Sequence, residues 1–518
     1  MNRFCMQVLR GGRLAAGLGL AAFLPAAAKE PFAGADTKWR RYESPNFELF
    51  SHNSDAKSRR LLHNLELLRG FFNEHNRIVE RRPLGVTVYY FSNKSDFDAY
   101  KPDSLGQSRI AGIYFHGADR AAIMVAPSND SQADQRLIFH EYVHHLIRTA
   151  GYDPPMWIGE GLAELYSTLV VKETVMELGR PVAGHLRLLN ITPLLPFEDL
   201  VTQQASAQVF QRGDLHTGVF YAQSWALMHF LNFGATELSS EKVDRLLGSL
   251  LLRREPPDAA EYRRLFEEAT GLSFRQLQER LDRYVSSGRY QWSKVPLPQV
   301  AKPASYTVTR VDLVEIRERL AELALRSKQA PLARLAMLEA ASGPNPIRGL
   351  EVLGNDELRN GDQHQAQRRW EAAIAAGSRN TAIFSQVGVM ESRRWFSSFD
   401  YEFRLPERKA EELRAMLQQS IAIAPDRVDA YEMLAWVEAF APSPSVKNVN
   451  LVQRKFTVLD DKPRTMLALA LVRLRVGDRF NGEAILAEVE RINPDWETLA
   501  AVRSVRRHLA QLPDRPNE

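Results

Sequence analysis

The stretch RLIFHEYVHHLIRTAG, residues 136–151, places histidines and a glutamate among apolar residues. His140 and His144 are four positions apart, so on a helix their side chains lie on one face, about 5–6 Å apart at Cβ. Two imidazoles at this spacing can bind one metal ion, and Glu141 beside them can accept a proton from a metal-activated water. This is the HExxH pattern, which predicts a metal-dependent hydrolytic site.

The residues around this pattern favour a helix over about 131–150. Ser131 is a candidate N-cap, Asp134 follows three positions later, and Gly151 is a stop signal. His145 points to a different helix face from the two candidate ligands, so we expect it to support the site from behind or to be solvated. Apolar residues recur at helical spacing, namely Leu137, Ile138, Tyr142, Leu146 and Ile147.

A catalytic zinc ion usually has three protein ligands and a fourth position open to water. The candidate third ligand is Glu160, in PPMWIGEGLAELYS (154–167), at 160 − 144 = 16 positions after the second histidine. This spacing lets the first helix end, turn through Pro154 and Pro155, and continue into an antiparallel helix. Glu164, one turn later, either accepts a hydrogen bond from the outer nitrogen of a ligand histidine or is solvated.

Residues 1–28 have the regions of an export signal: arginines, an apolar run and small residues before a cleavage point after Ala28. We expect a periplasmic or secreted protein, attached to a membrane only if the leader stays uncleaved. Removing the leader lowers the net charge from +4 to 4 − 3 = +1, which argues against nucleic acid as a partner. Cys5, the single cysteine, lies in the leader, so zinc must be held by His and carboxylate side chains.

Short apolar segments before the HExxH stretch predict a small mixed sheet, and therefore an α+β fold. Segment 121–126 is either an edge strand open to an extended peptide or an ordinary core strand. From about 158 to 290 the pattern is mainly helical. The candidate strands are NFELFS (46–51), LGVTVYYF (84–91), GIYF (112–115) and AAIMVA (121–126), the last two as a hairpin, with a helix over 54–76.

A proline-containing stretch, residues 293–310, is interpreted as a linker between two domains, 38–292 with the metal site and 311–518. The second domain follows a period of 34 residues and is expected to be an all-α, tetratricopeptide-like solenoid. A generic helical bundle is the alternative. Positions on the repeat template include Leu350, Gly354, Trp370, Ala470, Gly477 and Leu486.

The motif HEYVHH followed by WIGEGLAELYS resembles the gluzincin metallopeptidases, especially secreted bacterial members with an EGLAE helix. The resemblance implies a zincin-like domain, zinc bound by His140, His144 and Glu160, and Glu141 as the general base. The spacer before the third ligand is somewhat shorter than in the family. The glycine-rich motif that holds a free amino terminus in aminopeptidases is absent from the sequence, which argues against that activity.

Aminopeptidase N-like enzymes also supply a tyrosine that stabilises the developing oxyanion. Tyr221, at 221 − 160 = 61 positions after the expected third ligand, matches this placement. A core position at the start of an apolar helix is the alternative interpretation of Tyr221. His216 could fill the same role, and His185 is a weaker candidate.

Together these features predict an exported zinc-dependent endopeptidase that hydrolyses peptide bonds, with helical repeats that recruit substrate or partner proteins. The alternative is a catalytically silent, zinc-stabilised scaffold in which the repeats mediate protein–protein assembly. A pure scaffold has no need of a base at Glu141, which favours the enzyme. Hydrolysis of a non-peptide amide is a third interpretation, because the zincin pattern defines the reaction type better than the substrate.

Overall fold

The structure of the chain, a computed structural model, describes residues 32–511. Internal segments are left out of this description at 76–77, 79, 106–109, 129, 203–213, 236–237, 252, 254–255, 329–330, 398, 460–461 and 493–494. The expected export signal, residues 1–28, including Cys5, lies outside the described residues. No helix of the described part is both long and apolar enough to cross a membrane.

Strands of the described chain form a six-stranded mixed sheet in the order β4-β5-β3-β2-β1-β9. The pairs β2–β3 and β3–β5 are parallel, and the other neighbouring pairs are antiparallel. The predicted mixed sheet and the predicted hairpin are therefore confirmed. The strands are β1 (Arg40–Glu43), β2 (Phe47–Ser51), β3 (Val86–Tyr90), β4 (Gly112–His116), β5 (Ala121–Val125) and β9 (Thr307–Arg310).

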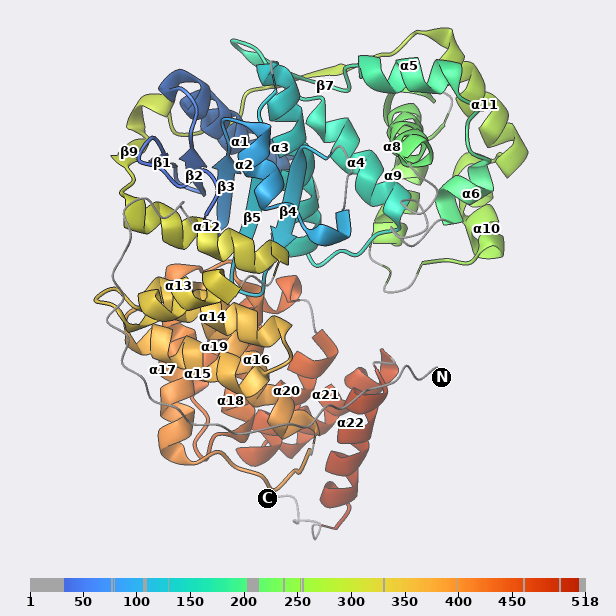
Figure 1. Ribbon diagram of the computed structural model, residues 1–518. Coiled ribbons are helices and arrows are strands. Elements are labelled where there is room, and N and C mark those ends of the chain that lie inside the picture. The colour runs from blue at the N-terminus through green and yellow to red at the C-terminus, as the bar shows by residue number, and fades with distance from the viewer. Residues whose placement is uncertain are drawn as a thin grey trace, which may run out of the picture.

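Both faces of this sheet are covered, because alternate side chains of each inner strand enter different cores. Val88 of β3 packs in the core that includes α1 (Asp55–His75) and α3 (Ser131–Thr149). Its neighbour Tyr89 packs in the core on the opposite face, with α12 (Leu313–Lys328). Figure 1 shows α12 beneath the strands. The helix expected to open the second domain thus completes the core of the sheet.

The stretch 293–310, expected to be a linker, is part of both sheets, and that expectation is corrected. β8 (Ser293–Pro296) pairs with β7 (Val175–Leu178) in a small sheet that also contains β6 (Val170–Val171). β9 then pairs with β1 at the edge of the large sheet. Proline is tolerated here because an edge strand needs hydrogen bonds on one side only.

Helices make up most of the rest of the described chain (Figure 1). The helices that precede β8 in the chain, besides α1 and α3, are α2 (Lys94–Ala99), α4 (Met156–Ser167), α5 (Ala183–Ile191), α6 (Phe197–Thr202), α8 (Asp214–His229), α9 (Ser240–Leu251), α10 (Ala259–Thr270) and α11 (Phe274–Ser287). Short helical turns are η1 (Asp103–Leu105), η2 (Phe230–Gly234), η3 (Pro303–Ser305) and η4 (Phe456–Val458).

The C-terminal region is helical, as predicted. Gly354 of α14 lets α15 approach closely, because a Cβ at this position would lie 2.4 Å from Nε1 of the fully buried Trp370. The helices of the C-terminal region are α13 (Pro331–Ser342), α14 (Ile347–Arg359), α15 (Gln363–Ala375), α16 (Thr381–Ser397), α17 (Glu407–Ile423), α18 (Val428–Phe440), α19 (Val446–Lys455), α20 (Lys462–Arg475), α21 (Arg479–Arg491) and α22 (Trp496–Leu509).

Buried polar contacts join this helical region to the sheet. Arg427, 2 % exposed, donates to the carbonyl of Pro83 just before β3 at 2.6 Å and pairs with Asp429 at 2.9 Å. In the turn between β4 and β5, Arg120 forms an ion pair with Glu351 of α14. A buried cation is stable only when it is paired, so these contacts fix the helical region against one end of the sheet.

Candidate metal centre

α3 carries the first three candidate site residues and begins at Ser131, so its N-cap lies one residue before the predicted one. Asp130, rather than Ser131, is the N-cap, and its carboxylate accepts a hydrogen bond from Gln132 N–H at 2.8 Å. Asp134, in the first turn, accepts from Ser128 N–H and pairs with Lys57 instead of closing a capping box. Carboxylates at both positions favour the positive end of the helix dipole.

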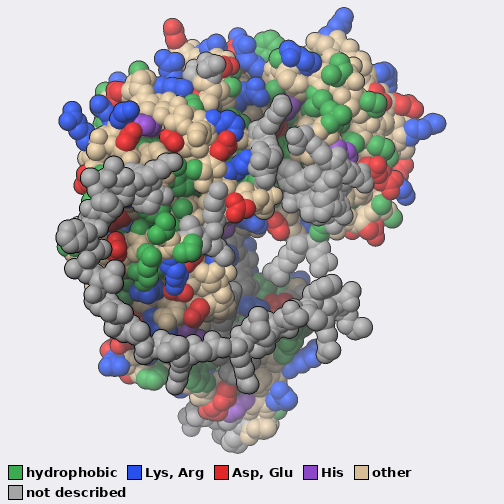
Figure 2. Space-filling model, in the orientation of Figure 1, with side chains coloured by type: hydrophobic (Ala, Val, Ile, Leu, Met, Phe, Trp, Pro, Cys, Tyr) green, Lys and Arg blue, Asp and Glu red, His purple; other side chains and the backbone are tan. Residues whose placement is uncertain are grey.

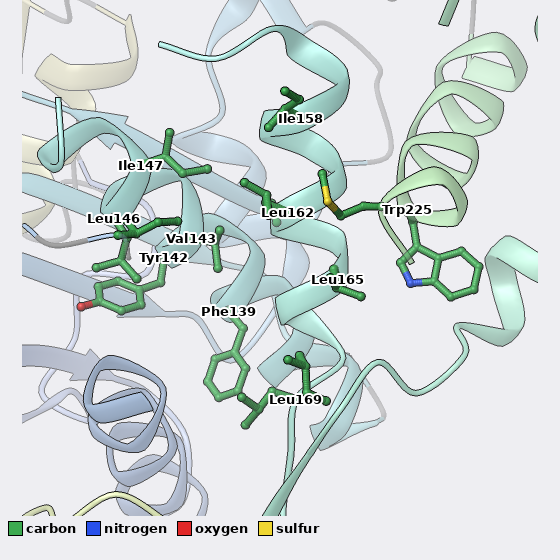
Figure 3. Packing of buried hydrophobic residues seen from close by; sticks show 14 of the residues in the cluster. Phe139, Tyr142, Val143, Leu146, Ile147, Ile158, Leu162, Leu165, Leu169 and Trp225 are labelled. Carbon is green, nitrogen blue, oxygen red and sulfur yellow. The ribbon is translucent and has the colours of Figure 1, made fainter. Parts of the chain in front are cut away.

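The packing of α3 and α4 places the candidate ligands of the two helices close together. Apolar side chains of both helices fill the space between them and the neighbouring elements (Figure 3). Because these residues occupy the buried faces, the remaining faces, with the candidate ligands, meet beside the core. The labelled residues are Phe139, Tyr142, Val143, Leu146 and Ile147 of α3, Ile158, Leu162 and Leu165 of α4, Leu169 and Trp225.

The candidate ligand atoms of His140, His144 and Glu160 converge on one point. The Nε2 atoms of the two histidines are 3.1 Å apart, and Oε2 of Glu160 lies 3.3 and 3.4 Å from them. Atoms bound to a tetrahedral ion at 2.0–2.1 Å lie about 3.3–3.4 Å from one another. The three donor atoms therefore have the separations that a single small ion requires.

The chemistry of these three groups also fits a cation. Oε2 of Glu160 is buried and accepts no hydrogen bond of good geometry from the described residues. An unsatisfied buried carboxylate oxygen is costly unless it meets a positive charge. Two imidazoles and a carboxylate suit several divalent first-row ions, zinc among them.

The charges of these side chains strongly perturb the pKa values of one another. Burial alone would lower the pKa of His140, but the carboxylates of Glu160 and Glu164 raise it to about 10. Burial alone would raise the pKa of Glu160, but the two histidines lower it to about 2. The cluster is thus built to hold positive charge next to a carboxylate.

Glu141 lies between the cluster of candidate ligands and strand β4. Burial raises the pKa of its carboxyl, and a backbone hydrogen bond from Tyr114 acts in the opposite direction. Gly112 leaves room for this side chain, because a Cβ on Gly112 would lie 3.2 Å from Oε1 of Glu141. The sequence contained no sign of either contact, since β4 is distant from α3 along the chain.

Glu164 connects the cluster to a further histidine. Its Oε1 lies 3.4 Å from Nδ1 of His140, while its Oε2 lies 2.9 Å from Nε2 of His185 on α5. The geometry agrees with the first of the two interpretations of Glu164, a contact with a candidate ligand histidine. His185, which the sequence offered as a weak substitute for Tyr221, lies behind Glu164.

Tyr221 of α8 lies beside the candidate ligands, with its ring centroid 6.3 Å from that of His140. Burial and the carboxylates of Glu160, Glu141 and Glu164 raise the pKa of its hydroxyl, so it remains protonated at neutral pH. His216 is on the same helix five positions earlier, which corresponds to about 140° around the axis. Because Tyr221 faces the cluster, His216 faces away from it.

His145 is not solvated, and its ring nitrogens bond to residues other than the candidate ligands. Its side chain is fully buried, stacks on Tyr142, and lies 3.2 Å from Oε1 of Glu80 and 3.3 Å from the Tyr114 hydroxyl. The expectation of a solvated His145 is wrong, because Glu80 approaches from a segment 65 positions away. Its contact with Tyr114 ties α3 to β4.

The edge strand of the large sheet beside the cluster is β4, and β5 is an inner strand. Segment 121–126, left open as edge or core strand, contains β5, which is buried and lies between β4 and β3. Ala126 N–H donates to Ala111 C=O at 2.8 Å, so odd-numbered residues of β4 bond to β5. The even-numbered residues Gly112, Tyr114 and His116 therefore direct their backbone groups outward, toward the side of Glu141.

No model of a known protein family matches this chain. No curated protein matches its sequence significantly either. The case for a function therefore rests on the residues and geometry described above.

Proposed function

We propose that this chain is an exported zinc-dependent endopeptidase of the gluzincin type. The observation that carries the proposal is the convergence of His140, His144 and Glu160 at the separations of metal ligands, with Glu141 beside them. The HExxH pattern with a later glutamate and the mixed sheet beside α3 agree with a zincin-like domain. The periplasmic or secreted location is the expectation from the leader.

His140, His144 and Glu160 would hold the zinc ion. When bound, the ion supplies Lewis acidity, which polarises a peptide carbonyl and makes water a better nucleophile. Glu141 accepts the proton of the attacking water and delivers it to the leaving amide nitrogen. Its pKa, raised by burial, brings it closer to the value that suits a general base near neutral pH.

The remaining site residues orient these groups. Tyr221, protonated because its pKa is raised, donates a hydrogen bond to the developing oxyanion. Glu164 accepts from Nδ1–H of His140 and so presents Nε2 of that ring to the ion. His185 holds Glu164 in place from the other side.

The substrate is proposed to be a polypeptide in extended conformation. Gly112, Tyr114 and His116 offer outward backbone groups on the edge of the sheet beside Glu141. Such an edge binds an extended peptide through main-chain hydrogen bonds. The helical region, in this proposal, recruits substrate or partner proteins.

The test is digestion of a diverse peptide mixture by the zinc-loaded protein, read by mass spectrometry, with Glu141→Ala as the paired control. Internal cuts that a chelator abolishes, and that the variant does not make, would support the proposal. A mixture left identical by both proteins would reject general proteolysis and favour the scaffold. A scaffold would keep its assembly partners in the Glu141→Ala variant.

A further inference from the structure

A cleft of about 850 Å³ lies where the sheet-containing part meets the C-terminal helices. Figure 2 shows the surface hollowed between the upper part of the molecule and the helical part below it. One wall contains the end of β4 and the turn after it, residues 116–118, and the end of α3 with the loop to Asp153. The opposite wall comes from α16, α18, α20 and α22.

The cleft continues the edge of β4. His116, the last residue of that strand, lines the cleft, whereas Gly112, the first, lies next to Glu141. Four strand residues span about 13–14 Å, so a chain paired with β4 beside Glu141 would reach the cleft within about five residues. A peptide held by the edge of the sheet is therefore directed into the cleft.

The charges that line the cleft are balanced by one another. The shorter cation–carboxylate distances are Arg427–Asp429 at 2.9 Å, Arg464–Glu497 at 2.8 Å and Arg148–Asp153 at 3.2 Å. A site for an anionic group would need cations that no carboxylate neutralises. The cleft is also lined by the apolar residues Leu84, Val389, Met433 and Trp436. This lining suits an uncharged stretch of polypeptide.

The two walls are fixed relative to each other. Ala118 N–H donates to Oδ1 of Asn355 at 3.1 Å, and Nε2 of Gln386 donates to Ala118 C=O at 3.4 Å. The turn that follows β4 is thus bonded to helices α14 and α16. The helical region contributes to a preformed binding surface, which reduces the entropy lost when a chain binds.

We propose that this cleft binds the part of an extended, unfolded polypeptide substrate that lies a few residues beyond the cleaved bond. This inference rests on the proposed function of the metal centre. It assigns the helical region a direct role in holding substrate. It also predicts that long, flexible chains are better substrates than short peptides with the same cleavage site.

The first experiment measures kcat/KM for nested peptides that share one cleavage site and are lengthened by two residues at a time at either end. For the wild type we expect an increase of about tenfold once the chain reaches the cleft at one of its ends, equivalent to about 1.4 kcal/mol. Met433→Arg should abolish this increase and leave the shortest peptide unaffected. Met433→Leu and Phe480→Arg, at a residue 85 % exposed on α21, are the matched controls.

An increase that Met433→Arg leaves intact, or no dependence on length, would overturn the inference. A second measurement does not require hydrolysis: a photo-crosslinking residue replaces Met433 or Phe480 in the Glu141→Gln variant, and a reduced, alkylated protein is the probe. Crosslinks at Met433 above those at Phe480 support the cleft even if no peptide is cleaved, which would reject only the proposed function. Equal crosslinking at both positions rejects the cleft, whatever the peptidase activity.

Discussion

Glu164→Gln should weaken metal binding while leaving all three candidate ligands in place. Among the described residues, the carboxylate of Glu164 lies 3.4 Å from Nδ1 of His140. Loss of such a partner typically lowers metal affinity by 10–100-fold. Because 3.4 Å is long for a hydrogen bond, we expect the lower end, about tenfold or about 1.4 kcal/mol. Glutamine keeps the shape and the contact to His185 but removes the negative charge.

The assay is competition for zinc against a chromophoric chelator, with circular dichroism to establish that each variant is folded. Glu241→Gln, at a side chain 83 % exposed on α9, is the matched control and should bind zinc as the wild type does. Equal affinities for Glu164→Gln and the wild type would refute the role given to Glu164. Another contact would then have to fix the orientation of the His140 ring.

Other residues give further predictions. Tyr221→Phe should lower kcat by about 10²–10³ with unchanged zinc content, because it removes one oxyanion donor; steady-state kinetics with metal analysis measures this. Gly354→Ala should destabilise the helical region by about 1–3 kcal/mol, since the new Cβ would overlap the Trp370 ring, as denaturant unfolding would reveal. Arg427→Ala should cost about 3–5 kcal/mol in the same assay, because Asp429 would remain buried without its cation.

Local patterns in the sequence were sufficient for the parts of the site that lie on single helices. The spacing of His140 and His144 follows from helix periodicity alone, and the two prolines before α4 correctly predicted its start. Glu160 could be predicted as the third ligand because a short turn between two helices restricts the position of the second helix relative to the first. The inner strands were equally readable, since runs of β-branched and aromatic residues are typical of strands buried on both faces.

Contacts between distant segments could not be predicted in this way. Nothing in the pattern around Gly112 indicates that Glu141 packs against it, or that Glu80 pairs with His145. The linker prediction failed at 293–310 because prolines mark both linkers and edge strands. α12 follows that stretch directly and covers the sheet, which only the three-dimensional packing of Tyr89 against it reveals.

The central claim is that Glu141 acts as a base beside a zinc ion held by His140, His144 and Glu160. The most direct test compares the wild type with Glu141→Gln for zinc content and for hydrolysis of one internally quenched peptide in the same preparations. We expect one zinc ion per chain in both proteins and hydrolysis by the wild type alone. Equal hydrolysis by both proteins, or no bound zinc in the wild type, would contradict it.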